Sequence, residues 1–107
     1  MKRGDLVTLA LPGGYGKPRP ALWIQSDLFD VHPSVTVLPV TSELRDAPLF
    51  RIRVEPTSAN GLRAVSEIMV DKAHTVPREK IGRVIGRLED ETMSAVNRAL
   101  ATFLGFA

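Results

Sequence analysis

The pattern of apolar and polar positions in the first half of the chain predicts three short β-strands. Residues 5–11 (DLVTLAL), 21–25 (ALWIQ) and 35–40 (VTVLPV) are apolar runs rich in strand-forming residues. Residues 12–18, between the first two runs, hold three glycines and two prolines, a composition that predicts a loop. Pro39 marks the end of the third strand or a sheet edge, because proline cannot donate to a strand ladder.

Residues 48–55 (PLFRIRVE) give the clearest strand pattern in the chain, because apolar and charged side chains alternate there. The apolar members are expected to face a core. Arg51 and Arg53 share the opposite face, where they either follow the backbone of a polyanion or are simply solvated. A solvated face is the expectation for this pair.

Farther along, Asn60-Gly61 predicts a turn. Residues 65–71 predict a fifth strand that ends in the charge of Asp71. Residues 81–88 (IGRVIGRL) predict a short strand or a mixture of helix and strand, because two glycines interrupt the apolar run.

The last segment predicts an amphipathic helix. It begins with three acidic residues, 89–91, which the helix dipole favours, and Gly105 is a suitable C-cap. Apolar side chains recur at spacings of three and four along one face: Met93, Val96, Leu100, Phe103 and Leu104. Short strands followed by one helix predict a single, mainly β domain over residues 1–107, with the helix packed on a strongly bent sheet or partly open barrel.

Composition limits the chemistry available to such a domain. The chain has no cysteine, which excludes disulfides and thiolate metal ligands, and its two histidines are His32 and His74. These counts argue against a structural zinc site and against a histidine-based triad, and both histidines are expected in loops. Catalysis would therefore use Arg, Lys, Asp, Glu, Thr, Ser or Tyr side chains, and no metal or other cofactor is expected.

Charge and hydropathy bear on the partner of the protein and on its location. The net charge of +2 and the pI of about 9.4 are compatible with a polyanionic partner and equally with a solvated, mixed surface. No apolar run approaches the ~20 residues that span a bilayer. The start, MKRGD, is polar again before a signal-peptide core could form, so a cytoplasmic protein without membrane contact is expected.

Three motifs stand in order along the chain: RGDLVTLAL at 3–11, KPRPALWIQSD at 17–27 and VLPVTSE at 37–43. Together with the helix after LEDETM, they resemble the MazF/PemK (Kid) family of toxins over nearly the whole chain. The resemblance implies an SH3-like small barrel of the CcdB/PemK type that forms a homodimer and binds a cognate antitoxin. It also implies metal-independent, sequence-selective cleavage of single-stranded RNA, which inhibits translation and growth.

The resemblance implies a catalytic pair as well. The arginine of the family's R-P motif and the threonine of its P-x-T-S motif match Arg19 and Thr41. RNA supplies its own nucleophile, the 2′-OH, so the protein mainly has to position the phosphate and stabilise developing charge. A guanidinium does this with two parallel hydrogen bonds, and a threonine hydroxyl can donate one more. Substrate-binding roles are expected for Tyr15, Lys17, Ser42 and Asp71.

The residues by themselves leave structural explanations open. Arg19 also suits a loop arginine that covers the end of a barrel, and Thr41-Ser42 suits turn capping through side-chain to backbone hydrogen bonds. Asp71 matches a position that is functional in some PemK-type members, but aspartate is common at strand ends. Tyr15, on the Gly-rich loop, is a better base-stacking candidate than Trp23, which the pattern places in the core.

The chain also departs from the family pattern. The loop GGYGKP lacks an acidic residue often present in MazF relatives, and Met69 stands where some PemK-type members have arginine. The end of the chain, FLGFA at 103–107, and the strand WIQSD are similar to the CcdB gyrase poisons of the same fold. A non-enzymatic gyrase poison is therefore the alternative function. The two alternatives differ in the residues that they require. A nuclease would need Arg19 and Thr41, whereas a gyrase poison would need the C-terminal tail, residues 103–107, instead.

Overall fold

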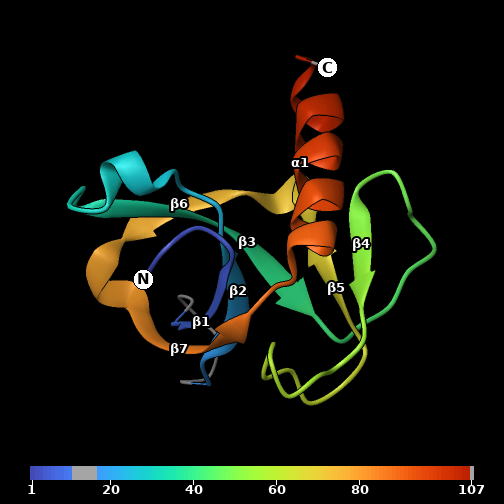
Figure 1. The fold of residues 1–107 in the computed structure, drawn as a ribbon, viewed down its shortest axis with the longest axis horizontal. Helices are drawn as coiled ribbons and strands as arrows, with labels where there is room; N and C mark the ends of the chain where they lie inside the picture. Colours follow the sequence, from blue (N-terminus) through green and yellow to red (C-terminus); the bar gives the residue numbers. More distant parts are fainter. Residues whose placement is uncertain (11–16, 107) are drawn as a thin grey trace.

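The computed structural model describes residues 1–10 and 17–106 of the chain. This part is mainly β-structure that ends in an α-helix, as the sequence predicts (Figure 1). None of the helices in it combines the length and apolar character needed to cross a bilayer. The elements are, in order, β1 (Asp5–Leu9), β2 (Arg19–Trp23), the 3-10 helix η1 (Asp27–Phe29), β3 (Ser34–Thr41), β4 (Arg51–Val54), β5 (Ser66–Met69), η2 (Val70–Lys72), β6 (His74–Pro77), η3 (Arg78–Lys80), β7 (Ile81–Arg87) and α1 (Asp90–Leu104).

The strands form one bent sheet in which every pair is antiparallel. The order is β4-β5-β3-β2-β1-β7, and β6 pairs with β3 away from this path. The first and last strands of the chain, β1 and β7, are therefore neighbours. Figure 1 shows how strongly the sheet curls, with α1 standing beside β3, β4 and β5. This arrangement matches the predicted bent sheet with a packed helix.

Pro39 lies inside the third strand, so it does not mark a strand end; of the two predicted alternatives, the structure agrees with a local sheet edge, because Pro39 is paired on one side only. On one side of β3, Ser34–Val37 pair with β6, and Val40 and Thr41 pair with β5. Pro39 falls between these two stretches and pairs only with Ala21 on β2. At this point β3 changes its neighbour from β6 to β5, so a residue without an N–H leaves no ladder hydrogen bond unmade there.

The core has two parts, one on each side of the bent sheet. Trp23 is buried in the smaller part with residues of β1 and β3, as the sequence predicts. The larger part lies under α1 and receives Met93, Val96 and Leu100 from the helix. Each fully buried aliphatic or aromatic side chain contributes about 1.5–3 kcal/mol relative to an exposed one.

The apolar stripe of the helix is only partly buried. Phe103 and Leu104 are exposed, at 52% and 58%, although their spacing continues the buried stripe. The last turn of α1 extends beyond the sheet, so no strand lies beneath it (Figure 1). Gly105 ends the helix in the left-handed conformation, with φ of 86°, and its N–H donates to the carbonyl of Ala101, as expected for a C-cap.

Several strand boundaries differ from the predicted ones. The first strand ends at Leu9, and the second already begins at Arg19. The strand predicted at 65–71 ends at Met69, and Asp71 lies in the 3-10 turn that follows. Residues 81–87 form a strand with two register shifts in its pairing with β1, so the strand alternative is correct and no helix forms there. The sixth strand, 74–77, was not predicted, because its four residues carry no alternation of apolar and polar side chains.

Candidate active site

A groove of about 950 Å³ opens where β2 begins and β3 ends. The turn after Asn60 and the outer face of β7 form its other walls. The side chains used below all line this groove: Lys17, Arg19, Thr41, Ser42, Arg63 and Arg83. Two predicted substrate-binding residues, Lys17 and Ser42, thus lie in the same cavity as the predicted catalytic pair.

Arg19 and Thr41 lie at the same end of two neighbouring strands. In the antiparallel pairing of β2 with β3, Ala21 is aligned with Pro39, and the pairing continues inward from there. Arg19 begins β2 and Thr41 ends β3, each two residues beyond that pair. Both side chains line the groove.

The hydroxyl of Thr41 has a fixed orientation. Its Oγ1 accepts a hydrogen bond from the backbone N–H of Glu43 at 3.0 Å, so the predicted turn-capping contact exists. This contact uses a lone pair and leaves the hydroxyl hydrogen available to donate. The capping role and a role toward a phosphate are therefore compatible. Ser42, the next residue, is exposed at the groove.

The groove is electropositive. Its described lining holds four cationic side chains, Lys17, Arg19, Arg63 and Arg83, and one carboxylate, Glu43. All four cations are exposed. Like charges around a concave surface raise the local concentration of an anionic ligand. The modest net charge of the chain is thus concentrated where a polyanion could lie.

The wall opposite β2 is held by a turn that is centred on buried Asn60. The side-chain carbonyl of Asn60 accepts the backbone N–H groups of Thr57 and Leu62, both at 3.0 Å. The N–H of Arg87 on β7 donates to the carbonyl of Ala59 at 2.8 Å and ties the turn to the sheet. The Asn60-Gly61 pair predicts this turn, but nothing in the sequence indicates that it brings Arg63 to the groove.

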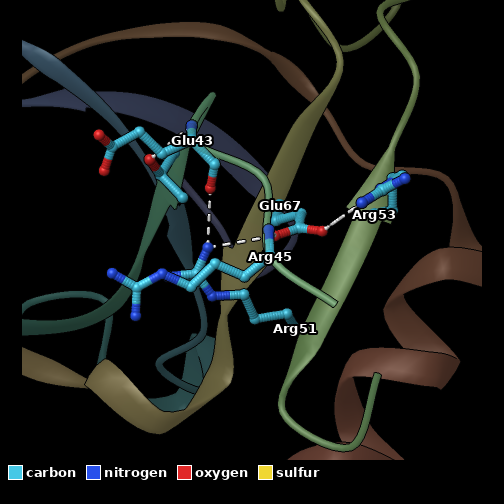
Figure 2. Close-up of polar contacts among 6 residues, drawn as sticks. Glu43, Arg45, Arg51, Arg53 and Glu67 are labelled. Carbon is cyan, nitrogen blue, oxygen red and sulfur yellow. Dashed lines mark hydrogen bonds and ion pairs between the residues drawn. The ribbon is translucent and has the colours of Figure 1, made fainter. Parts of the chain in front are cut away.

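A largely buried ion-pair cluster lies beside the end of β3 (Figure 2). Glu67 pairs with Arg51 at 3.1 Å and with Arg53 at 2.9 Å. The Arg51 side chain is 7% exposed, so the prediction that both arginines are solvated is wrong for Arg51 and correct for Arg53, at 54%. Arg51 is buried because Glu67, on the neighbouring strand β5, supplies the opposite charge that burial requires.

The carboxyl of Glu67 is ionised at physiological pH. The backbone N–H of Arg45, which donates to Oε1 at 2.9 Å, contributes most, followed by the guanidinium groups of Arg53 and Arg51. Together they lower the pKa of Glu67 to about 2, although burial acts in the opposite direction. Glu67 therefore carries the negative charge that its pairing with Arg51 requires at physiological pH.

The remaining candidates lie elsewhere. Asp71 does not line the groove; its Oδ1 is buried without a hydrogen-bond partner among the described residues, and its Oδ2 lies 3.8 Å from Lys72 Nζ. Tyr15 lies outside the described residues. His32 is a loop residue, as predicted, and its Nδ1 accepts the N–H of Ser34. His74 is exposed on β6, so its expected place in a loop is wrong.

Within residues 1–10 and 17–106, no group of three or more histidine or acidic side chains is arranged to hold a metal ion. What the groove offers is permanent positive charge beside an oriented hydroxyl. Such a site can hold a phosphodiester and donate hydrogen bonds to its oxygens. The fold and the site together define a small protein with a strongly bent β-sheet, a C-terminal helix and a groove suited to a polyanionic strand.

The chain belongs to the PemK-like, MazF-like toxins of type II toxin–antitoxin systems, because the model of that family matches residues 2–104. It is 54% identical over 108 aligned positions to a Mycolicibacterium smegmatis protein named "probable endoribonuclease MazF", covering 100% of this chain and 99% of the relative. These findings confirm the family that the three sequence motifs predict. They favour it over the gyrase poisons that the tail suggests.

Solved structures show the same fold. The Mycobacterium tuberculosis toxin MazF-mt6 superimposes with a TM-score of 0.82 at 26% identity, over 96% of this chain and 98% of the toxin. A mycobacterial endoribonuclease in complex with its cognate antitoxin gives a TM-score of 0.83 at 25% identity, over 100% of this chain and 97% of that one. The predicted mainly β fold with a C-terminal helix is thereby confirmed.

Proposed function

We propose that this toxin is a metal-independent endoribonuclease that cleaves single-stranded RNA in the groove, with Arg19 and Thr41 as its catalytic residues. The observation that carries the proposal is that both side chains line one electropositive groove. A relative that is 54% identical bears the name of an endoribonuclease, which supports the same activity here. Cleavage of messenger RNA would inhibit translation and growth.

The proposed reaction is a transesterification followed by product release. The ribose 2′-OH attacks the adjacent phosphorus and loses its proton, and the bond to the 5′ oxygen of the next nucleotide breaks as that oxygen gains a proton. Arg19 offers two parallel N–H donors to the phosphoryl oxygens, on which negative charge develops. The Thr41 hydroxyl donates one further bond. The products are a 2′,3′-cyclic phosphate and a 5′-hydroxyl.

Substrate binding is proposed to use the groove on both sides of this pair. Lys17 lies two residues before Arg19, Ser42 directly follows Thr41, and both line the same cavity, which suits contacts to neighbouring phosphates. Stacking of a base on Tyr15 stays a prediction, since that residue lies outside the described part. A substrate contact from Asp71 also stays a prediction; this side chain does not line the groove of a single chain.

Cleavage is expected to persist in EDTA and to require the substrate's own nucleophile. The purified chain should leave 2′,3′-cyclic or 3′-phosphate ends and 5′-hydroxyl ends, because the reaction described above uses no metal-bound water. The measurement is incubation with a long RNA in EDTA, followed by mapping of the ends. An otherwise identical RNA with 2′-deoxyribose at the mapped site is the control and should resist cleavage. Activity that appears only after magnesium is added would contradict the mechanism.

The proposed assembly is a homodimer that a cognate antitoxin silences. A structurally similar mycobacterial endoribonuclease is described in complex with its cognate antitoxin. An acidic or amphipathic antitoxin segment would complement the exposed cations around Arg19 and cover the site. Such a toxin would act where messenger RNA is translated, in the cytoplasm. Sedimentation at micromolar concentration should give the mass of two chains, and a monomer would contradict the dimer.

A further inference from the structure

We propose that Arg51 and Glu67 are positioning residues that orient the catalytic hydroxyl of Thr41. The inference rests on the proposed nuclease function and assigns a role to two residues outside the groove. Neither side chain lines the cavity that holds Arg19 and Thr41. Both reach the segment 41–45 from beneath, through the cluster shown in Figure 2.

The connection from Arg51 to Thr41 runs through one residue. Nη1 of Arg51 donates to the backbone carbonyl of Glu43 at 2.9 Å. The backbone N–H of the same Glu43 donates to Oγ1 of Thr41 at 3.0 Å. Arg51 therefore holds the residue whose amide fixes the threonine hydroxyl, and a shift of Glu43 would turn or release that hydroxyl.

Glu67 supports the same segment in two ways. It is aligned with Thr41 in the pairing of β3 with β5, so it lies on the strand next to the end of β3. Its Oε1 accepts both Nη1 of Arg51, at 3.1 Å, and the backbone N–H of Arg45, at 2.9 Å. One carboxylate oxygen thus fixes the arginine and the far end of the segment 41–45 together.

Burial makes this arrangement rigid. The side chains of Arg51 and Glu67 are 7% and 3% exposed, so neither can exchange its partner for water without leaving a charge unpaired. Arg53 differs, because it also pairs with Glu67 but is half exposed and donates its hydrogen bonds to that carboxylate. The chain therefore offers a natural control: two arginines on one strand share one carboxylate, and Arg51 is the one that donates a hydrogen bond to the segment 41–45.

The expected kinetic effect follows from the chemistry. The Thr41 hydroxyl is needed where charge develops, so its misorientation should lower the rate of the chemical step more than the affinity for RNA. Arg51→Met is expected to lower kcat about tenfold or more while KM changes less than about twofold. Arg53→Met should cleave at the wild-type rate.

A double mutant separates a positioning role from a merely structural one. If Arg51 acts through Thr41, Arg51→Met adds no further loss once Thr41→Ala is present. The measurement is kcat and KM for cleavage of one mapped RNA in EDTA by the full chain, its Thr41→Ala, Arg51→Met and Arg53→Met variants, and the double mutant. Circular dichroism at the assay temperature checks that each variant is folded.

If Arg51→Met does not fold, Arg51→Lys replaces it in the same kinetic test. Both bonds of Arg51 come from one nitrogen, Nη1, so one ammonium can keep the pair with Glu67 although it is shorter and reaches Glu43 less well. Its loss of kcat should be smaller than that of Thr41→Ala and should again disappear in the Thr41→Ala background.

The outcomes separate the two proposals. A wild-type chain that leaves RNA intact overturns the proposed function, and the positioning role with it. A wild-type chain that cleaves, with a folded Arg51 variant as fast as the wild type, overturns the positioning role alone. Two other results would also overturn the positioning role alone. One is a double mutant in which the activity losses of Arg51→Met and Thr41→Ala multiply; the other is an Arg53→Met variant that loses as much activity as Arg51→Met.

Discussion

Replacing Arg19 with alanine is expected to lower the rate of RNA cleavage by about 10²–10³, or about 3–4 kcal/mol of transition-state stabilisation, while the fold stays intact. The side chain is exposed at the start of β2, so its loss should hardly change stability. Thr41→Ala should lower the rate less, because a neutral hydroxyl stabilises developing charge more weakly than a guanidinium does.

Arg19→Lys is the informative control for this prediction. It keeps the charge but cannot donate two parallel hydrogen bonds, so it should recover little activity. The measurement pairs a cleavage rate with a circular-dichroism melting curve for each variant. If Arg19→Ala cleaves normally while truncation after Leu104 abolishes toxicity, the nuclease assignment is wrong and the gyrase-poison alternative takes its place.

Gly86→Ala is expected to lower the free energy of unfolding by about 3 kcal/mol, because overpacking against rigid backbone cannot relax cheaply. A Cβ at Gly86 would lie 2.2 Å from the carbonyl carbon of Asn60 and 2.3 Å from its oxygen. The turn around Asn60 would have to move away from β7 and break its bond to Arg87. Because that turn forms a wall of the groove, cleavage should fall as well.

Gly105→Ala provides the matched control for this stability effect. Nothing lies within 4 Å of a Cβ at Gly105, but its φ of 86° is left-handed, so alanine there costs only about 1–2 kcal/mol of backbone strain. Thermal melting should show a midpoint lowered by more than about 10 °C for Gly86→Ala and by clearly less for Gly105→Ala. Equal midpoints would contradict the steric explanation.

The sequence predicts the mainly β fold because most strands carry their own apolar pattern. Alternation or apolar runs mark β1 to β5, and the helix is marked by its acidic start and its stripe. β6 is missed because its residues are mostly exposed and it is held by pairing with β3, a long-range contact that leaves no local pattern. The exposed end of the stripe, Phe103 and Leu104, is missed for the same reason, since a helical period does not show where the opposing sheet ends.

The candidate site could be predicted only where a local motif carries it. Arg19 and Thr41 stand in short motifs that resemble the family, and the structure brings both to one groove. Arg63 and Arg83 have no such motif and reach the groove through the turn and the last strand. The burial of Arg51 depends on a carboxylate sixteen positions away on another strand, which an alternating pattern cannot reveal.

The groove is complete only after the last strand of the chain has been made. Arg19 and Thr41 come together in a hairpin of neighbouring strands, but the wall that carries Arg83 belongs to β7, which pairs with β1 at the opposite end of the chain. Contacts between distant parts of a chain form late in folding, because a long loop must close first. A growing chain therefore contains Arg19 and Thr41 before it has the wall that completes the groove, so the proposed site is finished only when β7 has paired with β1.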